Sequence, residues 1–81
     1  MKALHVFSLP SGEDERRDIT MLEQVAEKFS LGRLNYYDKI RKGKYTFLYA
    51  RFERGRVVIK HDGNIGMAIV KGNKIRARKG R

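Results

Sequence analysis

The chain has 81 residues, 19 of them Lys or Arg and 9 of them Asp or Glu, and its formal net charge is +10. It has no cysteine and its apolar runs are only a few residues long, which argues against a disulfide scaffold, a thiolate metal site and a membrane span. We therefore expect one small basic domain over residues 1–81, located in the cytoplasm and needing no cofactor or metal ion.

Charge is distributed unevenly along the chain. Residues 1–29 carry a net charge of −2, whereas residues 30–81 carry +12. An asymmetry of this size predicts a molecule with one positive face. Such a face most often meets phosphate groups, so the charge pattern points to a phosphate-bearing partner.

The first third of the chain predicts a strand followed by a long helix. Residues 2–8 alternate in polarity as a short strand does, and Pro10 and Gly12 interrupt the pattern. Apolar residues then recur at helical spacing, which predicts a helix over about 13–29. Its buried face is expected to carry Ile19, Leu22, Val25, Ala26 and Phe29.

The segment after this helix predicts a short second helix over about residues 33–41, because Leu34, Tyr37 and Arg41 fit one helical face. The stretch Leu34-Asn35-Tyr36-Tyr37-Asp38-Lys39-Ile40 is similar to the recognition-helix region of MerR-type regulators. That resemblance implies a helix-turn-helix that presents Arg33, Asn35, Lys39, Arg41 and Lys42 to DNA. We favour the alternative interpretation, in which two helices pack on a sheet.

From residue 44 onwards the pattern predicts four antiparallel strands, over 45–52, 56–60, 65–71 and 74–78. A two-residue turn at Arg54-Gly55 places the apolar residues Leu48, Ala50, Phe52, Val57 and Ile59 on one face. A bulged loop over residues 62–64 is expected to place Met67 and Ile69 on that same face. The fold class is therefore α+β, with the order β-α-(α)-β-β-β-β and residues 79–81 as a frayed basic tail.

The opposite face of this sheet combines an aromatic ring with cations. Nucleic-acid-binding sheets use such a mixture, because rings stack on bases and cations contact phosphates. The alternative is an ordinary solvated face, with Phe47 and Tyr49 covered by the second helix. Residues 71–81 add six cations and no acid. The candidate nucleic-acid-binding residues are Tyr49, Arg51, Arg56, Lys60, Lys71, Lys74, Arg76, Arg78, Lys79 and Arg81.

These features predict a small protein that binds RNA or DNA without catalysis. One alternative is a regulator or inhibitor that docks on an acidic protein surface. Another is a metal-independent ribonuclease toxin in which His5 or His61 acts as the base. The predicted core is thin, so we also expect a homodimer. Binding to a membrane is the least favoured class, because the polar face of the long helix is acidic.

Overall fold

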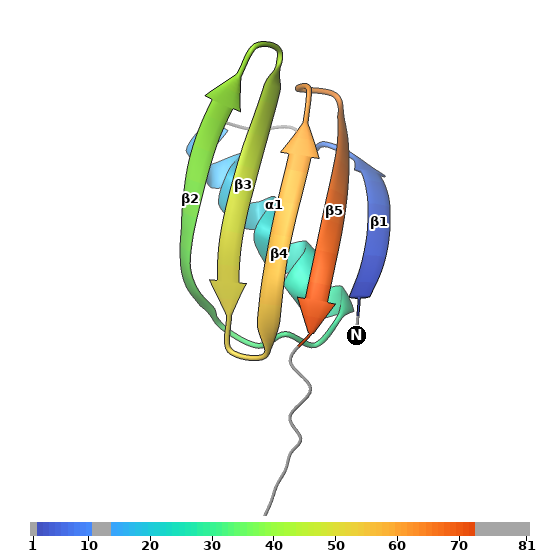
Figure 1. Cartoon of the computed structure of the whole chain (residues 1–81), viewed down its shortest axis with the longest axis vertical. Helices are drawn as coiled ribbons and strands as arrows, with labels where there is room; N and C mark the ends of the chain where they lie inside the picture. The colour runs from blue at the N-terminus through green and yellow to red at the C-terminus, as the bar shows by residue number, and fades with distance from the viewer. Residues whose placement is uncertain (1, 11–13, 73–81) are drawn as a thin grey trace, which may run out of the picture.

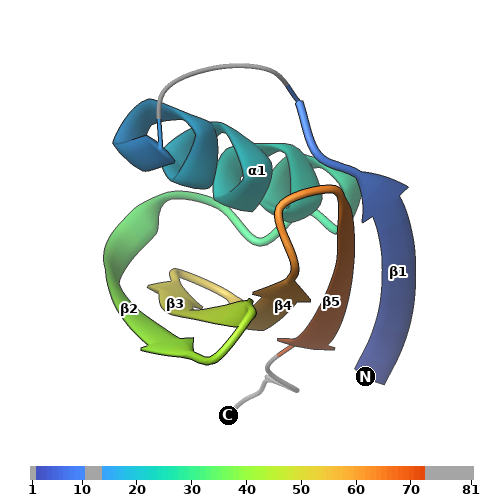
Figure 2. The ribbon, with the colours of Figure 1, turned by 90° about the horizontal axis from the view of Figure 1, so that it is seen from above.

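The computed structural model describes residues 2–10 and 14–72 (Figure 1). Its strands form one antiparallel sheet with the spatial order β1-β5-β4-β3-β2. The helix lies on one face of that sheet, and no described element covers the other face (Figure 2). The predicted α+β class is therefore confirmed. In chain order the elements are β1 (Lys2–Ser8), α1 (Asp14–Lys28), β2 (Leu34–Lys42), β3 (Tyr45–Phe52), β4 (Gly55–His61) and β5 (Ile65–Gly72).

The helix α1 agrees with the predicted range of 13–29 to within one residue at each end. The buried face of α1 is turned about the helix axis relative to the predicted face. Met21 is only 1% exposed, whereas Ile19 is half-buried and lines a shallow hollow with Arg16 and Glu23. The side chains that face the sheet follow the spacing of an amphipathic helix; they are Asp18, Met21, Leu22, Val25 and Ala26.

The face of the sheet beneath α1 holds the core. The five predicted core residues of β3 and β4, from Leu48 to Ile59, are buried there as expected. The hairpin between β3 and β4 turns at Glu53-Arg54 instead of Arg54-Gly55, because Phe52 pairs with Gly55. A Cβ at Gly55 would lie 2.5 Å from the carbonyl oxygen of Lys71, so only glycine fits this strand position. The two-residue shift in register leaves every side chain on its predicted face.

The prediction for β5 was wrong, because Met67 and Ile69 point away from α1 while Ala68 and Val70 are fully buried. The loop before β5 is an even-length turn and not a bulged three-residue loop. Its Gly63 has a φ of 98°, a conformation that favours glycine in short hairpins. Gly66 of β5 also leaves space for the ring of Phe7, because a Cβ at Gly66 would lie 2.8 Å from that ring.

The predicted second helix is also wrong, and with it the helix-turn-helix interpretation. Residues 34–42 form the edge strand β2, in which Lys39 pairs with Leu48 of β3. Gly43, with a φ of 61°, allows the short turn that joins the two strands. Tyr36, Tyr37 and Ile40 favour a strand, and pairing with β3 satisfies the backbone groups of β2 that point toward β3. The predicted strand over 74–78 and the tail over 79–81 lie outside the described residues.

Candidate nucleic-acid interface

A row of cations crosses the open face of the sheet, the face that α1 leaves uncovered. In the sheet register, Lys2 lies opposite Lys71, Lys71 opposite Arg56, and Arg56 opposite Arg51. We call these four residues the cationic row. Like charges directly opposite each other on neighbouring strands destabilise a sheet. An anion bound along the row would offset that repulsion, so the register itself favours an anionic ligand.

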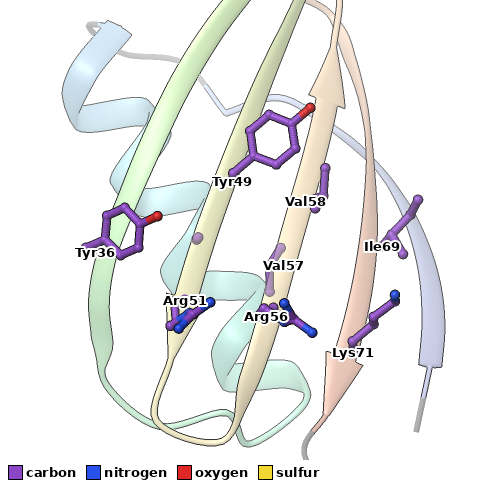
Figure 3. Close-up of a pocket in the computed structure, with 9 residues that line it drawn as sticks. Tyr36, Tyr49, Arg51, Arg56, Val57, Val58, Ile69 and Lys71 are labelled. Atoms are coloured by element: carbon purple, nitrogen blue, oxygen red, sulfur yellow. The ribbon is translucent and has the colours of Figure 1, made fainter.

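Exposed tyrosines lie next to the cationic row. Tyr36 pairs with Arg51 at the β2 edge and is 60% exposed, and Tyr49 is 41% exposed. Both line a shallow hollow of about 290 Å³, together with Arg51 and Arg56 (Figure 3). The ring of Tyr49 also stacks on that of Phe47, with centroids 6.4 Å apart. The hollow therefore brings ring faces and guanidinium groups together on one surface.

Lys60 lies on the same face but farther along β4 from the cationic row. Its Nζ lies 4.3 Å from the ring centroid of Tyr45 and 5.9 Å from that of Phe47. Both distances fall within the range of cation–π attraction. The neighbours of Lys60 are therefore aromatic rings, whereas Arg51 and Arg56 lie opposite each other in the cationic row.

Five predicted interface residues share the open face of the sheet. They are Tyr49, Arg51, Arg56, Lys60 and Lys71. The alternative in which a second helix covers Phe47 and Tyr49 is wrong, since residues 33–41 form no helix and β2 lies at the sheet edge. The other five predicted residues lie outside the described part of the chain; they are Lys74, Arg76, Arg78, Lys79 and Arg81.

Two residues of this surface, Lys2 and Tyr36, are not among the residues predicted from the sequence. Lys2 joins the cationic row only because β1 pairs with β5, and no local pattern indicates which strands pair. Tyr36 falls within the predicted second helix, although its aromatic neighbours and the Gly43 turn are signals of a strand.

The two histidines lie apart. His5 is on β1, where its ring stacks on Phe7 at 5.5 Å and meets the edge of Phe29. His61 ends β4, and β5 lies between the two strands. The two histidines therefore do not form a pair, and the ribonuclease alternative would depend on one of them acting alone as the base. Within residues 2–10 and 14–72, no group of three or more His, Asp or Glu side chains could hold a metal ion.

His61 is buried, with 4% of its surface exposed. Its Nδ1 accepts a hydrogen bond from the backbone N–H of Gly63 at 3.1 Å, which leaves the proton on Nε2. Burial, followed by the positive charge of Arg17, lowers the pKa of His61 below its usual 6.5. The ring is therefore neutral near pH 7.

An apolar strip borders the cations on the β1 side of the open face. Its residues Leu4, Val6 and Ile65 are 63%, 60% and 52% exposed. Large apolar side chains that gather on one surface indicate contact with another molecule more often than scattered ones do.

No protein-family model, curated protein or solved structure matches the chain. In the part of the chain that the structure describes, no helix is long and apolar enough to cross a membrane. We therefore infer function from the chemistry of the surfaces described above.

Proposed function

We propose that the protein binds single-stranded nucleic acid across the open face of its sheet. The observation that supports this most is the cationic row beside the exposed rings of Tyr36 and Tyr49. Cations give phosphate contacts that are independent of sequence, and aromatic rings stack on unpaired bases. The two kinds of group lie in neighbouring positions of the same sheet, as such a ligand requires.

The direction of the row suggests the path of the ligand. Neighbouring strands lie about 4.8 Å apart, so the four strands of the row span about 14 Å. A sugar–phosphate backbone that follows the row runs perpendicular to the strands, and its bases lie over Tyr36 and Tyr49. Bases in a duplex stack on each other and hide their faces. The exposed rings therefore favour single-stranded RNA or DNA over a duplex.

The experiment that tests this function measures fluorescence anisotropy of labelled single-stranded RNA, single-stranded DNA and duplex DNA over a range of salt concentrations. We expect tighter binding to the single strands and a steep loss of affinity with salt. The double variant Arg51→Gln/Arg56→Gln removes two phosphate contacts. It should therefore make the slope of log K against log salt less steep by about 1.4.

A matched control removes the same charge from the other side of the molecule. Arg16 and Lys28 are exposed residues of α1, so Arg16→Gln/Lys28→Gln lowers the net charge equally. If both double variants weaken binding to the same extent, the cationic row is not the binding site. A flat salt dependence would contradict nucleic-acid binding altogether. The probe should remain intact on a denaturing gel, and cleavage would favour the ribonuclease alternative.

The apolar strip favours a second candidate function, which is docking on an acidic protein surface. Leu4, Val6 and Ile65 would serve as apolar anchors, with the cationic row at the rim. A second copy of the chain could cover the same strip, which would give the expected homodimer. Val6→Glu should then abolish a complex that survives nuclease treatment, and sedimentation would reveal loss of a dimer. If the protein binds nucleic acid instead, nuclease treatment should destroy the complex.

A further inference from the structure

The outer side of β1 is an edge of the sheet. β1 is the last strand in the order β1-β5-β4-β3-β2, and no described element lies beyond it (Figures 1 and 2). On its inner side, the backbone N–H of Leu9 donates to the carbonyl of Asn64 at 3.0 Å. Inward and outward backbone groups alternate along an antiparallel strand, so the odd-numbered residues of β1 bond to β5. The backbone groups of Leu4 and Val6 therefore point outward, away from the sheet.

The side chains of β1 make this edge apolar. Leu4 and Val6 lie on the open face and are 63% and 60% exposed. From Ala3 to Ser8 the strand has no Lys, Arg, Asp or Glu. An exposed apolar edge strand is a template for pairing with another chain, and natural proteins usually block such edges with charges or bulges. β1 has neither device along most of its length.

The other edge of the sheet is protected in the usual way. Strand β2 carries the charged residues Asp38, Lys39 and Lys42. Its register also shifts between Leu34 and Tyr36, which interrupts regular pairing at that end. Charges and an irregular register both discourage the addition of a further strand. β1 is therefore the edge that is suited to pair with another strand.

We propose that β1 pairs antiparallel with β1 of a second copy of the chain, about a two-fold axis at His5. The two five-stranded sheets then form one continuous sheet. In this register Leu4 lies opposite Val6 of the second copy, and Lys2 lies opposite Ser8 of the second copy. The outward backbone groups gain hydrogen-bond partners, and the four exposed side chains of Leu4 and Val6 in the two copies cover one another.

The charge of β1 favours a second copy over an acidic protein or a nucleic acid. Either of those partners needs cations, and the only Lys or Arg of β1 is Lys2, at its end. Residues 1–29 carry a net charge of −2, so pairing through β1 joins the copies at the least basic part of the chain. In the proposed register the two Lys2 residues lie about 20 Å apart along the strands, so these like charges do not face each other.

The same geometry limits the assembly to two copies. A two-fold contact uses the same surface of both chains, so each β1 edge is consumed when the dimer forms. The edges that remain are the two protected β2 strands. Pairing of one strand is a small contact compared with a standard protein interface, so we expect a dissociation constant of about 1–100 µM.

The first test is sedimentation equilibrium of the full-length protein, freed of nucleic acid, from about 1 µM to 1 mM. We expect a reversible change from monomer to dimer. A monomer at every concentration would overturn the proposal, and so would species larger than a dimer. Arg51→Gln/Arg56→Gln should dimerise as the unmodified protein does, so the result is independent of the proposed nucleic-acid interface.

Two variants separate pairing at the edge from packing of the apolar strip. Val6→Pro removes an outward N–H but keeps the hydrogen bonds between β1 and β5, and edge strands tolerate proline at such a position. It should weaken the dimer at least about tenfold. Ile65→Ser removes an apolar side chain of the strip from β5, which is not an edge strand, and should leave the dimer unchanged. Equal losses would place the contact on the face of the sheet and overturn the proposal.

Hydrogen exchange locates the contact in the unmodified protein, so it does not depend on how well a variant folds. The amides of Leu4 and Val6 should exchange quickly in dilute solution and more slowly as the dimer forms. The outward amides of β2 should exchange at the same rate throughout. A dimer in which the amides of Leu4 and Val6 stay unprotected would overturn the proposal.

Cross-linking tests the register, because the chain has no cysteine of its own. A mixture of Lys2→Cys and Ser8→Cys should form mixed disulfides at least about tenfold faster than either variant alone, since only the mixed pair lies within reach of a disulfide. Lys42→Cys on β2 is the control and should form no such excess with Ser8→Cys. Equal rates in all mixtures would contradict the two-fold pairing of β1.

Discussion

The Nζ of Lys39 lies 2.9 Å from the Oδ2 of Asp18 and ties the edge strand β2 to the first half of α1. The side chain of Asp18 is 1% exposed and that of Lys39 is 31% exposed. The carboxylate is thus withdrawn from water, while the ammonium group remains in partial contact with it. Burying a lone carboxylate is costly, so Lys39 stabilises the position of Asp18 against the sheet.

Removing the ammonium group of Lys39 should destabilise the protein. Lys39→Met leaves the carboxylate of Asp18 buried without this partner, and we expect a loss of about 3 kcal/mol in the free energy of unfolding. A urea titration measures the loss. The double variant Asp18→Leu/Lys39→Met removes both charges and should recover most of the stability. Lys28→Met on the exposed side of α1 is the control, and an equal effect there would disprove the importance of the pair.

The end of α1 offers a change that should stabilise the fold. The backbone N–H of Leu31 donates to the carbonyl of Ala26 at 2.9 Å, and that of Ser30 donates to the carbonyl of Glu27 at 3.3 Å. This pair of bonds is a Schellman motif, and Ser30 occupies its left-handed position with a φ of 57°. Glycine adopts this conformation without steric cost.

Ser30→Gly should therefore raise the free energy of unfolding by about 0.5–1 kcal/mol, because relief of the left-handed strain exceeds the added entropy of the unfolded chain. Ser30→Ala keeps a Cβ and should bring no gain. Chemical denaturation of the three proteins checks both expectations. If Ser30→Ala also raises the free energy of unfolding, the cause is loss of the hydroxyl group and not relief of backbone strain.

The helix and the alternation of β3 and β4 could be predicted because they depend on local patterns. The spacing of Leu22, Val25 and Ala26 specifies a helix, and the alternation from Leu48 to Ile59 specifies which face is buried. Residues 34–42 fit both periodicities in part, since Leu34, Tyr37 and Arg41 can share one helical face. Pairing with β3 stabilises the strand, and a short stretch of sequence does not show which segments pair with each other.

The face on which β5 buries its side chains could not be settled by hydrophobicity. Met67 and Ile69 are larger and more apolar than Gly66 and Ala68, yet the smaller residues lie beneath the helix. The two-residue turn at Gly63 and the space taken by Phe7 fix the register. The same limit applies to the interface: Arg51 and Arg56 could be placed from one hairpin, whereas Lys2 depends on pairing between the two ends of the described chain.

Acid should destabilise the fold through His61. Burial first, and then Arg17, lowers its pKa in the folded state, with Lys39 acting in the same direction and Asp18 and Asp62 opposing it. The unfolded chain therefore takes up a proton before the folded one does, and stability falls as the pH drops below about 6.5. Urea midpoints between pH 7.5 and 5 would show this loss.

Substitution of His61 tests this cause. His61→Gln should flatten the dependence of stability on pH in that window, because it removes a group that titrates differently in the two states. An unchanged slope in His61→Gln would show that another group causes the loss of stability.

The basic residues that follow β5 should add to phosphate binding. Strand β5 ends at Gly72, directly after Lys71 of the cationic row. Replacing the five later cations by glutamine should make the salt slope for single-stranded RNA less steep by up to about 3.5. An unchanged slope would restrict binding to the sheet face. The substituted positions are Lys74, Arg76, Arg78, Lys79 and Arg81.

Stacking on Tyr49 distinguishes a nucleic acid from a generic polyanion. Tyr49→Ser removes the exposed ring and should weaken binding of single-stranded RNA by roughly 1–3 kcal/mol, which is about fivefold to 150-fold. Tyr49→Phe retains the ring and should bind almost as tightly as the unmodified protein. Heparin has no bases, so its binding should be the same for all three proteins. Anisotropy competition measures both ligands, and an equal loss for heparin with Tyr49→Ser would reveal a damaged fold instead of lost stacking.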